Sequence, residues 1–431
     1  MSQEQESLEK ITQDQLNAMV DLHARFTDGR LGGRRAILEN IDLSGLSLSG
    51  KDLTQAHFTA CLMTYMDLSN TNFQEAALYA CDLSDSNLFQ AIFTRADLRG
   101  ARIQNANLKN VDLKDADLRG GGVSKDGTFG TKSKAVNFRG ANLSGAKLNG
   151  AMASNADFSD AVMVGANMVD ADLRGAVLEG ADLSNADIEG AQLKGANIKS
   201  TILTGVDVSK MRSSGLDLKD AITDDNAGKT VSDLSDSLPK LLEYHREWLK
   251  TRGKSGKQLD LSDVDLRLLG SLKEEKMTAV KAVMARFIGM NLYKIELQSA
   301  TLEKSDFRNC DMEESDLRGS SFKNANLSHA NMRGSNCSSL MLGTGGTRRF
   351  NPCNFEQARM RYVDFTNAML KDAIFIGADL SFVDFTGADL SDADFTGAKL
   401  DKAKLDKAIT DGAKFDRDES RPVFKMKSDT S

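Results

Sequence analysis

Residues 388–400 read ADLSDADFTGAKL, and a large apolar side chain recurs there at every fifth position, at Leu390, Phe395 and Leu400. An alanine stands two places before each of them, and the residues between are mostly polar. Each unit therefore follows the order small, polar, large apolar, polar, polar. This pattern is the feature of the sequence from which the fold can be argued.

The same period runs through most of the chain. Large apolar residues occupy 55 of 59 positions spaced five apart, whereas a hydrophobic content of 40% would place about 24 there by chance. The positions fall in four blocks, at residues 43–118, 138–218, 272–342 and 355–405. Self-similarity at a fixed short period is the sequence signature of a repeat architecture.

A period of five fits neither a straight helix nor a flat strand. An α-helix turns by about 100° per residue, so five steps carry a side chain about 140° away from its starting face. A strand alternates its faces at every residue, so an odd period would turn every second large residue outward. The chain must therefore bend once per unit, which predicts an all-β solenoid whose coils stack about 4.8 Å apart.

The order of the aromatic residues indicates how many units close one coil. A coil of four units would stack Phe355 on Phe375 and Phe395, whereas a coil of three would stack Phe355 on Leu370. Continuous aromatic columns pack better than mixed ones. We therefore predict four units per coil.

The repeated units resemble a known family. The segments ADLSN at 181–185 and ADLSD at 388–392 are similar to the A(D/N)LXX motif of the pentapeptide repeat family, and the resemblance covers roughly 300 of the 431 residues. It implies a right-handed quadrilateral β-helix with four repeats per coil. It implies less about function: some members resemble double-stranded DNA in shape and charge and act on DNA gyrase, and most have no assigned role.

Two helix-like segments break the repeats in a matching way, which predicts two solenoids built to the same plan. Their apolar periodic residues are Leu8, Ile11, Met19, Leu22 and Phe26 in the first, and Leu234, Leu238, Leu241, His245 and Trp248 in the second. We expect these helices to cover the open edge of each first coil. His23 and Phe26 recur as His245 and Trp248, which predicts a hydrogen bond from each histidine within its cap.

The predicted organisation has five parts. They are a helical cap at 1–37, a first solenoid at 38–223 with a loop insertion near 120–134, a linker and second helical cap at 224–256, a second solenoid at 257–410 interrupted near 343–352, and a polar tail at 411–431. The register slips by one residue between Leu266 and Leu272. Residues 273–287 also fit an amphipathic helix, but we favour repeats there because the period of five continues through them.

Glycine-rich pieces interrupt the pattern at 120–134 and 343–349. The first could be a degenerate coil or a loop that bulges from the solenoid, and we favour the bulge. Loops on rigid scaffolds often carry function, so their cationic residues are candidate contacts: Lys125, Lys132, Lys134, Arg348 and Arg349. None of the glycine-rich pieces fits the phosphate-binding pattern GxxxxGK[ST].

No catalytic or metal-binding constellation is apparent. The five cysteines occupy apolar positions of the repeat and the chain has no CxxC pair, so we expect buried, reduced thiols and no metal or other cofactor. No apolar run is long enough to span a membrane. The amino terminus is polar, without an apolar signal core, which favours the cytoplasm.

The distribution of charge helps to decide between the candidate functions. The net charge is −7, but residues 101–150 form a basic belt, so the surface is mixed and direct nucleic-acid binding is not expected. We predict a non-enzymatic protein-interaction or scaffolding protein with an unknown protein partner. The alternative is a DNA mimic that binds DNA gyrase or a topoisomerase. The oligomeric state and the relative orientation of the solenoids stay open.

Overall fold

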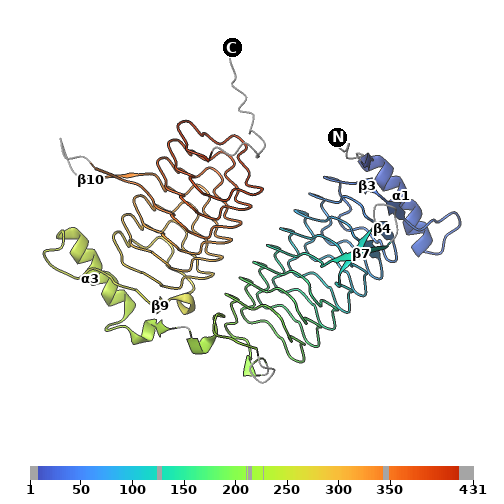
Figure 1. The fold of residues 1–431 in the computed structure, drawn as a ribbon, viewed down its shortest axis with the longest axis horizontal. Helices are drawn as coiled ribbons and strands as arrows, with labels where there is room; N and C mark the ends of the chain where they lie inside the picture. The colour runs from blue at the N-terminus through green and yellow to red at the C-terminus, as the bar shows by residue number, and fades with distance from the viewer. Residues whose placement is uncertain are drawn as a thin grey trace, which may run out of the picture. The chain divides into compact units, whose positions relative to one another are not determined.

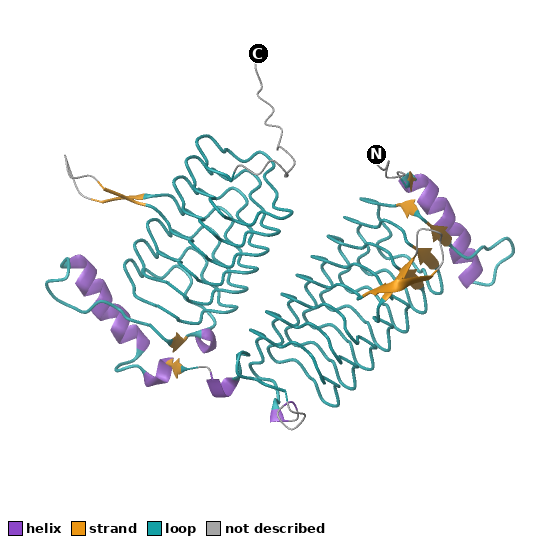
Figure 2. Cartoon of the chain, in the orientation of Figure 1, coloured by secondary structure: helices purple, strands orange, loops and turns teal. Residues whose placement is uncertain are grey.

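A computed structural model describes residues 8–123, 129–209, 211, 216–226, 228–342 and 349–416. The chain divides into two compact units, Met1–Asn226 and Ala227–Ser431. Each unit contains one wound stack of short bends and bridges, with one long helix next to its first coil (Figure 1). Figure 2 shows that turns and isolated bridges, rather than long strands, make up most of each stack.

Parallel bridges between residues twenty positions apart hold the coils together. Asn87 pairs with Asn107 in the first unit, and Asp364 pairs with Asp384 in the second. The only regular sheet of three strands among the described residues joins β2 (Ile37–Glu39), β4 (His57–Thr59) and β5 (Ala77–Tyr79) in the same register. A spacing of twenty corresponds to four five-residue units per coil.

Each bend falls on the last residue of a unit. The backbone there is left-handed, with φ of 59° at Asn110, 59° at Asp392 and 71° at Gly397. Asparagine, aspartate and glycine tolerate this conformation better than other residues. Where an Asp or Asn precedes the large side chain, it can fix the turn: the Ser391 N–H donates to Asp389 Oδ1 at 3.0 Å.

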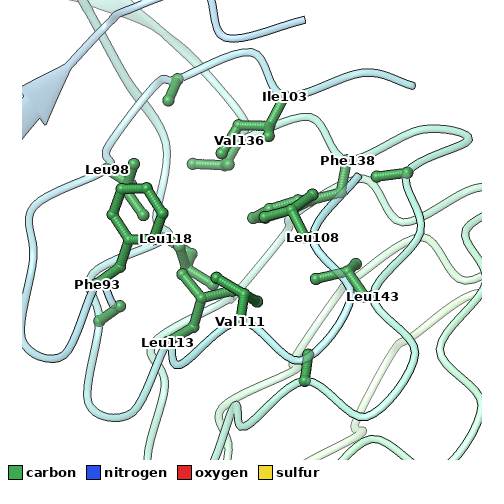
Figure 3. Close-up of a cluster of buried hydrophobic side chains, with 14 of the residues drawn as sticks. Phe93, Leu98, Ile103, Leu108, Val111, Leu113, Leu118, Val136, Phe138 and Leu143 are labelled. Atoms are coloured by element: carbon green, nitrogen blue, oxygen red, sulfur yellow. The ribbon is translucent and has the colours of Figure 1, made fainter. Parts of the chain in front are cut away.

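The large side chains of each unit meet in its interior. Figure 3 shows Phe93, Leu98, Leu113 and Phe138 among the apolar side chains that point into the core of the first unit. The small alanines occupy the same interior and are also buried. The core is thus a continuous column of side chains rather than a layer between two sheets.

The predicted aromatic columns are confirmed. Phe375 stacks on Phe355 with ring centroids 5.1 Å apart and on Phe395 at 4.9 Å. Phe365 stacks on Phe385 at 5.5 Å in a neighbouring column. All of these rings have at most 1% of their surface exposed. Phe375 is thus held between two other rings by contacts that a mixed column would lack.

The first helix begins later than its apolar pattern predicted. α1 spans Gln13–Thr27, because Thr12 closes a capping box with Gln15. Leu8 and Ile11 therefore lie outside the helix. The short strand β1 (Glu9–Lys10) instead pairs in parallel with β3 (Ile41–Asp42) on the first coil. The Gln13 side-chain amide also bonds the backbone of Ser47: its Nε2 donates to the carbonyl at 2.9 Å, and its Oε1 accepts from the N–H at 2.8 Å.

The segment between the two solenoids is made of short elements. A 3₁₀ turn at Asp224–Asn226, strand β8 (Lys229–Thr230) and a second 3₁₀ turn at Val231–Asp233 precede α3, which spans Leu238–Lys250. Leu234 thus lies before the helix, contrary to the predicted pattern. Pro239 lies in the first turn of α3, where a backbone N–H would have no partner within the helix, so its missing N–H costs no hydrogen bond. Strand β8 pairs in parallel with β9 (Val264–Asp265).

Residues 273–287 form repeats and not a helix. Lys276 bridges Glu296 and Lys281 bridges Thr301, at the usual spacing of twenty. The one-residue slip before them is taken up by a 3₁₀ turn at Arg267–Leu269. Across this turn the bridge spacing changes from 21 residues at Asp265–Arg286 to 20 at Ser271–Asn291.

The second solenoid extends past its predicted end at residue 410. Asp394 bridges Lys414, and Phe415 stacks on Phe395 with ring centroids 4.8 Å apart. The predicted polar tail therefore begins too early. The apolar spacing continues to Phe415, but Thr410 interrupts it, and the polar composition of residues 411–414 hides the last units.

Candidate interaction surfaces

Among the residues that the structure describes, each unit carries one antiparallel hairpin that leaves the coil. In the first unit, β6 (Gly121–Val123) pairs with β7 (Phe129–Lys134), and the bridge spacing jumps to 35 at Arg102–Asn137. In the second, β10 (Leu340–Leu342) pairs with β11 (Arg349–Asn351), and the spacing jumps to 33 at Ser321–Asn354. The coil resumes in register after each hairpin, so the ladder continues beneath both insertions.

Both hairpins cross a glycine of the preceding coil. A Cβ placed on Gly100 would lie 2.7 Å from the carbonyl carbon of Gly121, and one on Gly319 would lie 2.9 Å from Leu340 Cβ. Both glycines also have positive φ, of 71° and 68°. A side chain at either position would therefore be strained and would push the base of the hairpin outward.

The β10–β11 hairpin carries exposed apolar side chains. Met341 and Phe350 stand opposite each other in the register, and 52% and 68% of their surfaces are exposed. Leu342 is 45% exposed beside them. Its neighbour Arg349 is also exposed. Apolar side chains gathered on a projecting element are typical of a protein-binding surface.

A shallow groove lies at the base of this hairpin. It has a volume of about 300 Å³ and is lined by Thr301, Ser321, Lys323, Asn351 and Asn354, among other residues. The Asn351 side chain, which lines the groove, donates to the Gly319 carbonyl at 2.6 Å. Side chains that can donate or accept hydrogen bonds thus lie next to the apolar hairpin.

The predicted loop contacts fall only partly within the described structure. Arg349 lies in β11 and is exposed. Lys132 and Lys134 lie in β7, but their side chains are outside the described part of the structure. Lys125 and Arg348 lie outside the described residues. The five candidates are divided between the two units. Only the Arg349 side chain is described, and it lies beside an exposed apolar cluster.

The two predicted cap histidines have the same local geometry. The Ala36 N–H donates to His23 Nδ1 at 3.1 Å, and the Leu259 N–H donates to His245 Nδ1 at 3.1 Å. Because Nδ1 accepts in both, the ring proton belongs on Nε2. Both rings are fully buried. Each histidine thus ties its helix to the residue just before the first bridged residue of the coil, Ile37 or Asp260.

An aromatic side chain one turn along each helix covers the histidine. His23 stacks on Phe26 and His245 stacks on Trp248, both with ring centroids 5.7 Å apart. The second junction is more completely bonded, since His245 Nε2 lies 3.0 Å from the Thr278 carbonyl oxygen. His23 Nε2 faces the backbone of Thr54, with no partner within hydrogen-bonding distance among the described residues.

These junctions should make stability depend on pH. Burial lowers the pKa of His245, so below about pH 6.5 the unfolded chain binds more protons than the folded chain and the free energy of unfolding falls. We expect the melting temperature of the second unit to drop by about 2–4 °C between pH 7.5 and 5.5. In His245→Asn, which keeps an acceptor for Leu259, this drop should disappear.

Calorimetry at several pH values checks this expectation. His57→Asn is the control, because the His57 side chain is exposed on β4 of the first unit, outside the unit whose transition is followed. The control should keep the pH dependence of the natural chain. If the drop persisted in His245→Asn, another group would be responsible.

Comparison with protein families agrees with this geometry. The model of pentapeptide repeats matches residues 137–175, 166–205, 285–319, 295–334, 349–381 and 373–409. A second model, described as a pentapeptide repeat region, matches residues 34–108. Together these ranges cover more than half of the chain. The chain belongs to the pentapeptide repeat family.

Solved structures of pentapeptide repeat proteins are among those similar to this chain. QnrB1, a plasmid-mediated fluoroquinolone resistance protein, is 21% identical over 44% of this chain and 91% of its own, with a TM-score of 0.26. HetL of Nostoc sp. strain PCC 7120, involved in heterocyst differentiation regulation, is 18% identical over 90% of this chain and 93% of its own, with a TM-score of 0.14. No curated protein sequence matches the chain.

The described residues contain neither a membrane-spanning helix nor a cluster of metal-ligating side chains. No helix there has the length and apolar character that a membrane crossing requires. In the same part of the chain, no group of three or more His, Cys, Asp and Glu side chains is placed to hold a metal ion.

The sequence did not reveal the exposed apolar cluster of the second hairpin. Leu342 was expected in the core, because it keeps the five-residue spacing. This expectation is wrong: Leu342 lies in β10, since the chain leaves the coil after Cys337. The only signal in the sequence is the glycine-rich piece at 343–349. It indicates an insertion but not the residue at which the chain leaves the coil.

Proposed function

We propose that this pentapeptide repeat protein is a non-enzymatic protein-binding scaffold. In this proposal two right-handed quadrilateral β-helices, each with a helical cap, hold the hairpins β6–β7 and β10–β11 away from the coils. The β10–β11 hairpin is the principal contact. Coils stacked by bridges around a packed core are stiff, so a hairpin rooted in them is presented in a fixed place.

The exposed pair Met341 and Phe350 is the observation that carries the proposal. The repeat turns polar residues outward at most positions, so large apolar side chains on its surface are mostly single. On this hairpin three of them lie within two paired strands. Burying such side chains in a partner would release free energy at about 25 cal/mol per Å² of apolar surface.

The charges of the coils favour this proposal over a DNA mimic. A mimic needs rows of carboxylates without neighbouring cations. Here Arg119 lies 2.7 Å from Asp117, Lys276 lies 3.2 Å from Glu296, and Lys323 lies 2.7 Å from Glu356. Gln55 and Arg95 likewise bond Glu75 from the coils on either side. Apart from the neutral Gln55, these partners place cations beside carboxylates that a mimic would leave unpaired.

The hairpin proposal is tested by replacing its apolar pair. The double variant Met341→Ser, Phe350→Ser should lose at least about tenfold in capture of the partners that the natural chain retains from native lysate. Its melting temperature should stay within about 2 °C of the natural value, because both side chains are exposed. Quantitative mass spectrometry of the captured proteins gives the ratio.

Met284→Ser is the matched control. Met284 is 48% exposed, close to the exposure of Met341, but lies on a coil of the same unit and not on the hairpin. Capture by this variant should equal that of the natural chain. Equal capture by the hairpin variant would refute the assignment of the binding surface.

A supercoiling assay distinguishes the proposed scaffold from a DNA mimic. A DNA mimic would inhibit DNA gyrase at micromolar concentration, whereas the scaffold proposed here should leave supercoiling unchanged. Inhibition that survives the loss of Met341 and Phe350 would favour the mimic.

A further inference from the structure

The hydrogen bonds between coils give each stack two different ends. The Leu183 N–H donates to the Ile202 carbonyl of the next coil at 2.8 Å. The Asn185 N–H donates to the Thr204 carbonyl of that coil, also at 2.8 Å. In return, the Ile202 N–H donates to the Ala181 carbonyl at 2.9 Å. This unit thus offers two N–H groups and one carbonyl to the coil that follows it, so an edge without a following coil has an excess of donors and suits an anion.

A carboxylate occupies this donor position at the last coil of each unit. The Gly205 N–H donates to Asp224 Oδ2 at 2.9 Å. The Gly397 N–H donates to Asp416 Oδ2 at 2.8 Å. Each aspartate follows its glycine by 19 residues, the separation at which a backbone carbonyl accepts the same bond elsewhere in the stack. A carboxylate can therefore take the place of the carbonyl of a following coil.

Two donors of the same kind lie where a row of bridges ends in the first unit. The last bridge of this row joins Asn167 to Asp187. Ile188 and Gly190 hold the two donor places of the next coil edge, yet neither N–H donates to another residue among those that the structure describes. The turn between them is fixed, because the Ile188 carbonyl accepts from the Ala191 N–H at 3.0 Å. The pair can therefore receive an acceptor from outside the chain.

A pocket of about 420 Å³ lies against these two residues. Its lining includes Ile188 and Gly190 themselves, the apolar side chains of Leu193 and Met211, and Lys194. Leu193 and Met211 are buried, whereas Lys194 is exposed. The volume falls within the range of about 300–1,000 Å³ that is typical of small-molecule sites. Two N–H donors, an apolar wall and a cation thus belong to the same pocket.

The charges beside the pocket act in opposite directions. Arg174 also lines it, but its guanidinium already bonds both carboxylate oxygens of Asp172, each at 2.7 Å. Lys194 has no such ion pair among the described residues. Asp170 lies close to Gly190, since a Cβ placed on Gly190 would collide with Asp170 Oδ1. An anion at Gly190 is thus favoured by Lys194 and opposed by Asp170.

We propose that this pocket binds a small monocarboxylate with an apolar tail. The carboxylate accepts from the Ile188 and Gly190 N–H groups, as the two terminal aspartates do at their own coils, and Lys194 balances its charge. The tail packs against Leu193 and Met211. The coil holds both donors in place before the ligand arrives, so binding requires little ordering of the chain. The site lies within the first unit and does not depend on the β10–β11 hairpin.

Octanoate is the probe, titrated into the full-length protein at neutral pH and followed by calorimetry. We expect saturable binding with a dissociation constant below about 1 mM. Octanamide keeps the tail without the charge, and acetate keeps the charge without the tail, so each should bind at least about tenfold more weakly. Absence of octanoate binding, or equal binding of octanamide, would overturn the proposal. Equal binding of acetate would indicate an adventitious ion only.

Three variants locate the site. Lys194→Glu should weaken octanoate binding at least about tenfold, because an anion replaces the cation beside the carboxylate. Lys199→Glu is the matched control: Lys199 is exposed at the same place of the next five-residue unit but does not line the pocket, so affinity should stay within about twofold. Asp170→Asn should strengthen binding about threefold or more. Equal weakening by both lysine variants, or no gain in Asp170→Asn, would overturn the placement of the carboxylate.

Nuclear magnetic resonance of the deuterated, nitrogen-15-labelled protein tests the two donors directly. With octanoate, the amide protons of Ile188 and Gly190 should shift downfield, as expected for N–H groups that gain a charged acceptor. The amides of Gly205 and Gly397 should not move, because each already donates to an aspartate. Shifts confined to other amides would place octanoate elsewhere and overturn the site.

Discussion

Phe375→Ala should destabilise the second unit by about 3–5 kcal/mol, the usual cost of removing a buried phenylalanine. The ring of Phe375 lies between Phe355 and Phe395 and meets Phe365 and Phe385 edge-on, so its loss leaves a cavity bounded by four other rings. The melting temperature of this unit should fall by about 10 °C. Differential scanning calorimetry resolves the change.

Phe382→Ala is the matched control, because it removes the same side chain from the outside of the same unit. Phe382 is half-buried at a bend, where it stacks on Tyr362 with ring centroids 4.8 Å apart. We expect this variant to lose about 1 kcal/mol, the value of one exposed aromatic pair. Equal destabilisation by the two variants would contradict the inward placement of every large residue.

Ala378→Asp should have a larger effect. Ala378 occupies the small inward position of its unit and has no exposed surface. A carboxylate there would be buried without a cation and would also overfill the core, and each effect costs several kcal/mol. We expect the second unit to lose its cooperative thermal transition at pH 7, while the first unit keeps its own.

The control for this variant is Met369→Asp. Met369 points outward at 46% exposure and bridges Asp389, so aspartate already stands at the equivalent place one coil away. This substitution should change the melting temperature by less than about 2 °C. Circular dichroism of both variants gives the comparison, and unfolding of Met369→Asp would mean that inward and outward positions are wrongly assigned.

The repeat could be predicted because each five-residue unit encodes its own bend. A residue tolerant of positive φ, such as Asn110 or Gly397, ends the unit, and a polar side chain such as Asp389 fixes the turn before it. These are local interactions, so the sequence of one unit is enough to place its large side chain inside. The column of Phe375 follows from repeating that unit.

Elements that depend on tertiary contacts were harder to predict. The apolar spacing cannot show where α1 begins, because the signal there is a local polar one, the capping box of Thr12 and Gln15. It also cannot show where an insertion starts, since Leu342 keeps the spacing after the chain has left the coil. The register shifts by one residue before residue 272. A 3₁₀ turn accommodates this shift, and the repeat pattern does not predict such a turn.

The candidate surfaces were predicted with mixed success for the same reason. His23 and His245 were found because the two units repeat a helix with an aromatic side chain three residues on. Their bonds to Ala36 and Leu259 depend on the coil that each helix meets.

A distance measured along one column tests the central claim, that twenty residues make one coil. Asn291 and Lys404 are both exposed and are linked through five successive bridges, by way of Asp311, Asn331, Asp364 and Asp384. Five coil spacings of about 4.8 Å place them about 24 Å apart. Spin labels attached there should give a narrow distance distribution near this value by pulsed electron resonance. Fifteen residues per coil would instead give about 32 Å, and a peak there would contradict the account.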